Sequence, residues 1–259
     1  GTITNGKLTG DTVMEIGAGL LGKALPQGEP EKLVQSYLAA SDDNNATFQA
    51  LKEAFGGQAF YTPAHKIPFS SKRKWGCISF AGSGSVFVGA PEKLMRKLPG
   101  ELEQRLEEGC RVIIVGYVPM QWEDEAALPE EIQPLYGVVL EDTIRENTRE
   151  TLEFFHREGV DVKVISGDHV KTVSMIAKRA GLHRWKDAVD LSTLGEDIDY
   201  EQICQQYAVF ARVTPGQKKE LVCALKRQGH QVAMTGDGVN DLLALREADC
   251  SIAVADGSD

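Results

Sequence analysis

The chain has 259 residues, a net charge of −10 and five widely spaced cysteines. This length fits one large or two modest domains and is enough for a substantial hydrophobic core. The negative charge argues against non-specific binding to nucleic acid. An odd number of cysteines without a CxxC pair indicates buried thiols in a reducing compartment, rather than a disulfide framework or a zinc site.

No apolar run in the sequence approaches the roughly 20 residues that a membrane-spanning helix needs. No stretch has the pattern of a secretory signal peptide either. We therefore expect the chain to be soluble and to lie inside the cell.

The first half of the chain, as far as about Pro134, mixes helical and strand patterns. Read alone, the polar residues 1–10 predict a loop, and the acidic residues 123–134 predict an exposed connection. Helical spacing of apolar residues predicts helices at residues 31–40, 46–55, 91–97 and 101–108. Strand-like runs lie at residues 67–69, 75–80, 85–88 and 111–118, with a glycine-rich hairpin connection at 82–84. This order predicts an α+β unit with an antiparallel sheet.

From Leu135 onward, strand and helix patterns alternate. The expected strands are residues 136–140, 160–165, 209–211, 231–234 and 251–254. The expected helices are residues 146–158, 170–180, 199–206, 215–228 and 240–247. Regular alternation of this kind predicts a parallel sheet that is covered by helices on both faces.

Three of the expected strands end in polar turns. These turns are Ser166-Gly167-Asp168, Arg212-Val213-Thr214 and the loop of residues 235–241, Thr-Gly-Asp-Gly-Val-Asn-Asp. The carboxyl ends of parallel strands share one edge of a sheet, where such sheets bind ligands. We therefore expect the three turns to converge on one site. Gly236 and Gly238 are expected to allow the tight turn and a close backbone approach.

The residue types at these strand ends suit phosphoryl transfer. Ser166 and Gly167 offer a hydroxyl and backbone amides, Lys218 offers an ammonium, and Asp237 and Asp241 offer hard oxygen ligands for Mg²⁺. Each residue has a plainer interpretation when it is taken alone: a turn serine, a solvated lysine or a helix-capping aspartate. The prediction depends on their shared edge.

The same motifs carry a resemblance to a known family. Residues 135–259 closely resemble the phosphorylation domain of P-type cation-transporting ATPases, a branch of the haloacid dehalogenase-like phosphotransferases. The matching stretches are residues 235–241, Ser166-Gly167-Asp168, Arg212-Val213-Thr214-Pro215 with Lys218, Asp142-Thr143-Ile144-Arg145 as a variant of a hinge motif, and Gly1-Thr2-Ile3-Thr4. Together with the middle segment, the resemblance covers the whole chain.

The resemblance implies a fold and a division into domains. Residues 1–8 would begin an α/β, Rossmann-like phosphorylation domain that continues at 138–259, with a parallel sheet and helices on both faces. Residues 9–137 would be an inserted α+β nucleotide-binding domain with an antiparallel sheet. The aspartate that accepts phosphate would lie three positions before Gly1, and the first strand of the sheet would precede it. The sheet is then expected to have a gap, to be filled by another segment, or to pack poorly.

In the middle segment, Phe69 occupies the place of the family's adenine-stacking aromatic residue, and a ring against a purine is a favourable contact. The alternative is a core phenylalanine on a strand. Residues 89–92, Gly-Ala-Pro-Glu, match a family motif in which Val88 replaces a lysine. This replacement removes an ammonium from the nucleotide pocket. Arg111 aligns with an arginine that reaches the phosphates, and its alternative is a surface arginine.

The resemblance also implies a set of site residues, with ATP and Mg²⁺ as cofactors. The catalytic set is Ser166, Gly167, Asp168, Lys218, Asp237, Asn240 and Asp241. The nucleotide-binding set is Phe69, Ser71, Arg73, Gly89, Arg111 and Arg212, and Asp237 is the metal ligand. The expected hinges are residues 7–10 and 137–145.

The whole protein is then expected to be an integral membrane pump with these domains at the cytoplasmic face. Membrane helices outside this chain would bind the transported cation, for which Ca²⁺ or another divalent ion is favoured, and no nucleic acid is expected as a partner. Without the acceptor aspartate, this chain should be inactive. The alternatives are a soluble haloacid dehalogenase-like phosphatase with a cap domain and a module that only binds nucleotide.

Overall fold

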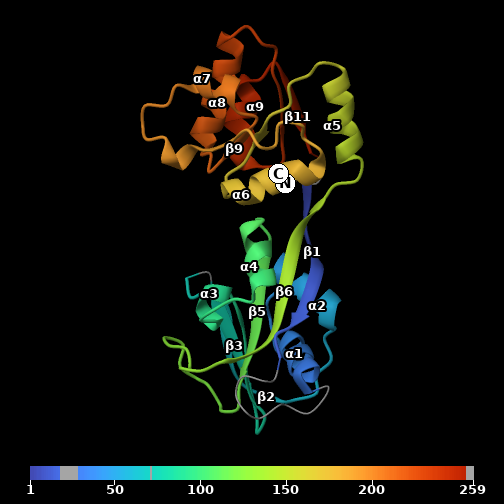
Figure 1. Ribbon diagram of the computed structural model, residues 1–259, viewed down its shortest axis with the longest axis vertical. Helices are drawn as coiled ribbons and strands as arrows, with labels where there is room; N and C mark the ends of the chain where they lie inside the picture. Colours follow the sequence, from blue (N-terminus) through green and yellow to red (C-terminus); the bar gives the residue numbers. More distant parts are fainter. Residues whose placement is uncertain (18–28, 71, 255–259) are drawn as a thin grey trace. The chain divides into compact units, whose positions relative to one another are not determined.

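The computed structural model describes residues 1–17, 29–70 and 72–254 (Figure 1). The chain divides into two compact units. Unit 1 contains Gly1–Gly6 and Asp142–Asp259, and unit 2 contains Lys7–Glu141. The borders therefore fall at Gly6/Lys7 and Glu141/Asp142, near the expected 8/9 and 137/138. The functions expected of the two units remain predictions.

Unit 2 is built on one sheet. Its strands are β1 (Thr4–Glu15), β2 (Pro63–Ser70), β3 (Trp75–Phe80), β4 (Gly84–Gly89), β5 (Arg111–Val118) and β6 (Gln133–Ile144). They lie in the order β1-β6-β5-β4-β3-β2, and the neighbours from β2 to β6 pair antiparallel. The predicted hairpin is confirmed, since Phe80 pairs with Gly84 across the turn. The predicted antiparallel sheet is confirmed as well.

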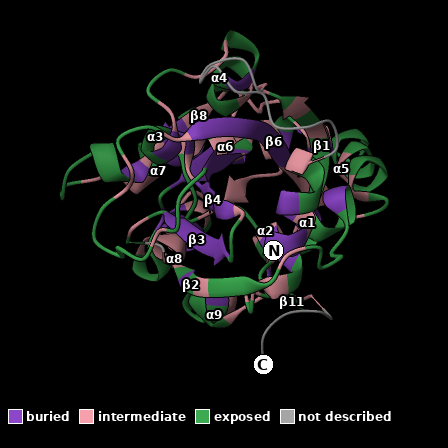
Figure 2. Cartoon of the chain, turned by 90° about the horizontal axis from the view of Figure 1, so that it is seen from below, coloured by how far each residue is buried: buried purple, intermediate pink, exposed green. Residues whose placement is uncertain are grey.

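Apolar side chains cover both faces of this sheet. The helices α1 (Glu29–Ala40) and α2 (Ala46–Phe55) pack on one face with Ile78, Val88 and Val115. The short helices α3 (Pro91–Leu94) and α4 (Gly100–Glu107) supply Leu94 and Leu102 to the cluster on the other face. Because both faces are covered, β3 and β4 are buried at every position, as Figure 2 shows.

The described residues of unit 1 form two parallel sheets. The first has the order β7-β9-β8, from Val164–Ile165, Val209–Ala211 and Ala188–Asp190, and the second pairs β10 (Ala233–Gly236) with β11 (Cys250–Ala253). The α-helices are α5 (Thr148–Arg157), α6 (Val170–Ala180), α7 (Tyr200–Gln206), α8 (Pro215–Arg227) and α9 (Leu242–Glu247). The described residues of the unit also form two 3₁₀ turns, η1 (Leu191–Thr193) and η2 (Val239–Asp241).

The first of these sheets is covered on both faces, as predicted. Phe210 of β9 joins the cluster that contains Ile203 of α7 and Leu221 of α8. Its neighbour Val209 joins the opposite cluster, which contains Val173 of α6. Successive strand residues point to opposite faces, so β9 is packed between these helices.

The parallel sheet predicted for unit 1 is observed in two pieces. Among the described residues its strands form two separate sheets, and a gap was one of the three expected arrangements. The strand predicted at residues 160–165 is observed only at Val164–Ile165, where hydrogen bonds to β9 are available. A strand is defined by its ladder, so the unpaired part of this apolar run does not count as strand.

The strand predicted at residues 136–140 was assigned to the wrong sheet. It belongs to β6, which pairs with β5 from Arg111↔Leu140 onward and so lies in the sheet of unit 2. Residues 133–140 are buried throughout and contribute to the clusters on both faces. A short apolar run shows that a segment is buried, but not which sheet buries it.

Other differences concern the ends of elements. The polar residues 1–10, expected as a loop, contribute most of their length to β1, which is the edge strand next to β6. Helix α3 ends at Leu94 rather than at residue 97, because Met95 has extended backbone angles. The helix predicted at 240–247 is split into η2 and α9. Strand β8 was not predicted. Of the helices within the described ranges, none is long and apolar enough to cross a bilayer.

Candidate active site

The loop that follows β10 is held together by Asp241. One oxygen of this buried carboxylate, Oδ1, lies 2.7 Å from the Nζ of Lys218 on α8. The other oxygen, Oδ2, accepts a hydrogen bond of 3.2 Å from the backbone N–H of Asp237. Asp241 thus fixes the ammonium of Lys218 and the backbone of Asp237 at the same time. The structure therefore brings together Lys218, Asp237 and Asp241 from the predicted set.

The close packing of Asp241 against Gly236 leaves no room for a side chain at position 236. A Cβ added at this position would lie 2.6 Å from the Cβ of Asp241 and 2.9 Å from its Oδ2. Any side chain there would displace the carboxylate that holds the loop. The expectation for Gly238 is corrected: its φ of −162° is extended backbone, which other residues adopt without strain. A close approach that requires glycine is therefore shown at Gly236.

The turns after β7 and β9 are joined by their backbones. The N–H of Val213 donates to the carbonyl of Ser166, and the N–H of Arg212 donates to the carbonyl of Asp168, each over 3.0 Å. The Oγ of Ser166 accepts a hydrogen bond of 3.1 Å from the N–H of Asp168, which closes the turn around Gly167. Two of the three predicted turns thus lie side by side at one edge of the sheet.

Arg212 has a φ of +52°, a left-handed conformation that costs energy for a residue other than glycine. Its side chain is exposed, and so are Asp168 and Asn240. This residue lies where the chain passes from β9 into α8, and such a conformation persists only where the surrounding structure holds it. The strain makes this turn a defined geometry rather than a loose connection.

Helix α8 connects the two groups of residues. Thr214 caps its first turn in a capping box with Gln217, and Pro215 occupies the first helical turn. The N-cap therefore follows directly after Val213, which contacts the Ser166 turn. Lys218 lies one turn into the helix and contacts Asp241. A continuous path of contacts thus runs from the Ser166 turn through the start of α8 to the Asp237 loop.

The charges at this edge are balanced by close partners. Partial burial raises the pKa of the Asp237 carboxyl, but the amino group of Gly1, 3.1 Å from its Oδ2, outweighs burial and leaves that pKa below the usual range. At the end of β8, a hydrogen bond from Ser192 lowers the pKa of Asp190, and the charge of Arg212 acts in the same direction. Asp237 is therefore ionised at neutral pH.

The residues present fit a magnesium ion at Asp237. Its carboxylate is about one-third exposed, which leaves its oxygens accessible to a cation. Within the described ranges, no group of three or more His, Cys, Asp or Glu side chains is arranged to hold a metal ion by itself. Mg²⁺ commonly needs only one or two protein carboxylates, because substrate phosphates and water complete its shell.

In unit 2, Phe69 lies on the face of the sheet that carries α1 and α2. It is half-buried and packs against the cluster that includes Val88. Gly76 of β3 lies between them: it pairs with Val88, and a Cβ added at Gly76 would lie 2.8 Å from the backbone nitrogen of Phe69. The sequence analysis missed Gly76. A lone glycine inside a strand pattern is the signal that indicates such a close approach.

The other predicted nucleotide-binding residues have varied surroundings. Arg111 is exposed at the start of β5. Gly89 is buried, and a Cβ there would lie 2.7 Å from both the Lys74 carbonyl and the Trp75 side chain. The guanidinium of Arg73 donates to the carbonyl of Pro68 over 2.6 Å and lies over the ring of Trp75. Ser71 lies outside the described residues.

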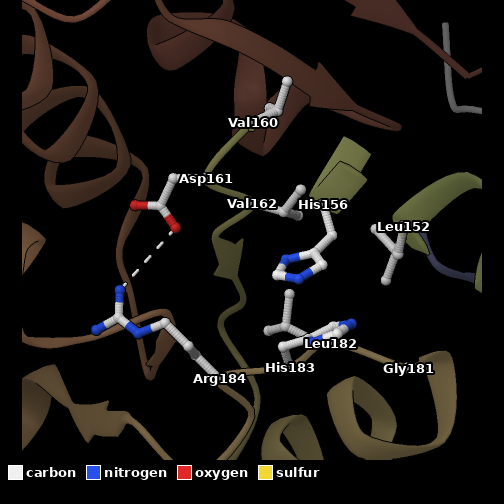
Figure 3. A pocket seen from close by; sticks show the side chains of 9 residues that line it. All are labelled: Leu152, His156, Val160, Asp161, Val162, Gly181, Leu182, His183 and Arg184. Atoms are coloured by element: carbon white, nitrogen blue, oxygen red, sulfur yellow. Dashed lines mark ion pairs between the residues drawn. The ribbon is translucent and has the colours of Figure 1, made fainter. Parts of the chain in front are cut away.

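A cavity of about 90 Å³ lies beside α5, where none of the predicted residues was placed (Figure 3). Its apolar wall includes Leu152 and Leu182, and the rings of His156 and His183 stack at a centroid distance of 3.7 Å. The Nε2 of His183 also lies 3.0 Å from a carboxylate oxygen of Glu153. These contacts attach α5 to the segment that follows α6. The cavity contains no residue of the candidate active site.

Comparisons with known proteins place the chain among related sequences. The family model described as a haloacid dehalogenase-like hydrolase matches residues 1–249. The probable cation-transporting ATPase exp7 of Streptococcus pneumoniae is 40% identical over 258 residues, which cover 99% of this chain and 32% of that protein. The calcium-transporting ATPase CtpE of Mycobacterium tuberculosis is 41% identical over 87% of this chain and 28% of its own length. The chain thus spans about a third of the length of these relatives.

Proposed function

Because the chain belongs to the haloacid dehalogenase-like hydrolases, we propose that it is the nucleotide-binding and phosphorylation part of a P-type ATPase that transports a cation across a membrane. The observation that carries the proposal is the contact of Asp241 with both Lys218 and the backbone of Asp237. This arrangement occurs within the loop of residues 235–241, and an ammonium and a carboxylate fixed in this way suit a transferring phosphoryl group.

In this proposal each residue of unit 1 has a defined task. The ammonium of Lys218 faces the negative charge of the phosphoryl group, and Asp241 keeps that ammonium in place. The hydroxyl of Ser166 and the backbone amide of Gly167 donate to the phosphoryl oxygens. Asp237 would hold Mg²⁺, which neutralises phosphate charge when it is bound. Asp168 and Asn240 support the two turns at the edge of the site.

Unit 2 is proposed to bind ATP. The adenine would stack on Phe69, whose backbone lies against Gly76, and Arg111 would reach the phosphates from the exposed start of β5. Gly89 supports the proposal because it keeps the end of β4 close to Lys74 and Trp75. Arg73, which is engaged by Pro68 and Trp75, would position this segment rather than bind phosphate. Arg212 is proposed to contact the nucleotide.

The whole protein would transfer the terminal phosphate of ATP to an aspartate and couple that step to movement of an ion. We propose that this aspartate precedes Gly1, so the chain alone binds nucleotide without turning it over. Membrane helices in other parts of the protein would bind the transported ion. This chain would lie at the cytoplasmic face. A divalent ion is favoured because relatives include the calcium-transporting CtpE and a magnesium-transporting ATPase of Escherichia coli.

The experiment that tests this proposal is calorimetry of ATP binding with and without Mg²⁺. We compare the chain with its Phe69→Ala variant and with Phe60→Ala, a matched control at an exposed phenylalanine of the same unit. Loss of one stacked ring is expected to weaken binding about tenfold or more, since stacking on a base contributes roughly 1–3 kcal/mol. The control is expected to bind as the unchanged chain does.

Equal affinities for all three chains would contradict the placement of adenine at Phe69. A second measurement examines unit 1: Lys218→Met is expected to weaken binding of inorganic phosphate in the presence of Mg²⁺ and to leave ATP binding to unit 2 unchanged. Turnover of a phosphate ester by the unchanged chain would favour the alternative of a soluble phosphatase.

A further inference from the structure

Two histidines join helix α5 to the segment that follows α6. The ring of His156 on α5 stacks on the ring of His183, with a centroid distance of 3.7 Å and an interplanar angle of 19°. The Nε2 of His183 also lies 3.0 Å from a carboxylate oxygen of Glu153, three residues before His156 on α5. Glu153, His156 and His183 are here named the histidine cluster. All three side chains are exposed, so they exchange protons with water.

Apolar burial contributes little to the attachment of α5. None of its residues is buried, and Leu152 is half-buried against the apolar cluster that contains Leu182. A further polar contact joins α5 to α6, where the Nη2 of Arg149 donates to the carbonyl of Arg179 over 3.1 Å. Regions with few buried apolar contacts open at low free energy. The strength of a single polar contact therefore changes how often α5 opens.

The cavity of about 90 Å³ lies beside the histidine cluster (Figure 3). The charged groups on the elements around the two rings are Arg149, Glu153 and Arg157 on α5, Asp161 after α5, Arg179 at the end of α6, and Arg184. Most of them are engaged elsewhere: Arg179 donates to the carbonyl of Asp142, and Asp161 lies 4.0 Å from Arg184 and 3.1 Å from Lys163. Among the described residues, Glu153 is the carboxylate that contacts a ring.

A proton on His183 strengthens its contact with Glu153. Imidazole is the side chain whose charge changes between pH 5 and 8. A charged donor makes a hydrogen bond to a carboxylate that is roughly twice as strong as a neutral one. The hydrogen bond from His183 keeps the pKa of Glu153 below its usual range, so Glu153 stays ionised over this interval. A second proton, on His156, would place two like charges 3.7 Å apart, so the stacked pair favours a single proton.

We propose that the histidine cluster is a pH-sensitive switch that holds α5 more firmly at pH 6 than at pH 8. The protonated form of His183 gains the stronger contact, so the added attachment is present at low pH and is lost as the pH rises and the proton leaves. Helix α5 leads through residues 158–163 into β7, and Ser166 follows β7 directly. The switch thus makes the segment before the Ser166 turn sensitive to pH, and it does not depend on the proposed function.

The experiment is amide hydrogen exchange of the full chain, followed by NMR and expressed as protection relative to an unstructured chain at the same pH. Protection at residues 149–157 is expected to be about two- to fivefold higher at pH 6 than at pH 8, the scale of an exposed ion pair. In His183→Phe a ring remains to stack on His156 but binds no proton, so this difference is expected to vanish. His156→Phe keeps the contact of His183 with Glu153 and is expected to retain the difference.

Glu153→Gln removes the carboxylate and is expected to abolish most of the difference. Two matched controls are expected to keep all of it: Glu150→Gln, at an exposed carboxylate of the same helix, and His230→Phe, at an exposed histidine after α8. These controls separate the histidine cluster from a general effect of charge or of any histidine.

A second measurement follows the Glu153 carboxyl by NMR during an acid titration. Its pKa is expected to rise in His183→Phe, because the hydrogen bond that lowers it is then lost. Three results would each overturn the proposal: no pH difference in the unchanged chain, an equal difference in His183→Phe, or an unaltered titration of Glu153 in that variant. Neither measurement involves nucleotide. If the unchanged chain fails to bind ATP, the proposed function falls while the switch stands.

Discussion

Strands β3 and β4 of unit 2 are buried at every position, whereas strand β11 of unit 1 is exposed at every position. The first two have apolar clusters on both faces of the sheet. Strand β11 depends mainly on its ladder with β10. The comparison teaches that two sheets in one chain can be stabilised differently, one by burial of apolar surface and one largely by backbone pairing.

The helices of the two units differ in burial as well, and α5 of unit 1 is an example. None of its residues is buried, and Phe154 and Phe155 are exposed. In unit 2, by comparison, α1 buries five residues, including Tyr37. Regions with few buried apolar contacts open at lower free energy than regions with many. We therefore expect parts of unit 1 to open locally before unit 2 does.

The largest expected difference concerns the reactivity of the cysteines. Burial raises the pKa of Cys77 in unit 2 to about 12 and that of Cys204 in unit 1 to about 11, whereas Cys250 is exposed. Only the thiolate reacts, and at pH 8 a thiol with a pKa of about 11 is roughly one-thousandth ionised. Alkylation followed by mass spectrometry is expected to modify Cys250 first, Cys204 later and Cys77 last.

The pH dependence of this labelling has a defined sign. Both raised pKa values lie above the working range, so each unit of rising pH increases the thiolate fraction of Cys204 and Cys77 about tenfold. Labelling of both is therefore expected to accelerate from pH 7 to pH 9. Modification of Cys77 before Cys204 would reverse the comparison, because it would show that unit 2 opens first.

A smaller effect is expected from truncating one ring in each unit. Phe87 of β4 is fully buried, with its ring 5.9 Å from that of Trp75, so Phe87→Ala is expected to destabilise unit 2 by about 3–5 kcal/mol. Phe154 of α5 is half exposed, and Phe154→Ala is expected to change unit 1 by about 0.5 kcal/mol or less. Urea unfolding, followed by NMR signals of each unit, measures both changes. Similar losses in the two variants would remove the contrast in burial.

An effect smaller than that of Phe87→Ala is expected from a single methyl group in the candidate active site. Gly236→Ala would place its Cβ 2.6 Å from that of Asp241 and is expected to destabilise unit 1 by about 1–3 kcal/mol. Gly216→Ala on α8 is the matched control, because a Cβ there has nothing within 4 Å. Helix propensity predicts that the control is stabilised by roughly 0.5–1 kcal/mol. Thermal unfolding of the two variants tests this, and shifts of the same sign would contradict it.

Sequence patterns predicted the local structure better than the pairing of strands. Helix α2 was predicted at its observed bounds, and so were β3 and β5, because apolar periodicity and turn residues act over a few neighbours. The assignment of β6 failed because a buried apolar run has no feature that selects its partner strand. Strand β1 was missed because its residues are mostly polar and exposed, and its partner is more than a hundred residues away.

In the candidate active site, too, local features were predicted from the sequence and contacts between distant segments were not. The loop of residues 235–241 was identified by its residue types, and so was Lys218. The packing of α8 decides which oxygen of Asp241 accepts from Lys218 and which accepts from the backbone of Asp237. The spacing of residues in the sequence does not predict this packing. The requirement for glycine at Gly76 and Gly137 also arises from neighbouring elements. Such requirements can be recognised only from the structure, which shows the opposing backbone or side chain.

The capping box at the start of α8 fixes more than the helix. An α-helix turns by about 100° per residue, so a start one residue later would rotate Lys218 away from Asp241 by more than a quarter of a turn. Thr214 and Gln217 set that start through their capping box, and Pro215 occupies the first helical turn. The direction of the Lys218 side chain is thus determined by residues 214–217, and it is defined as soon as this helix forms.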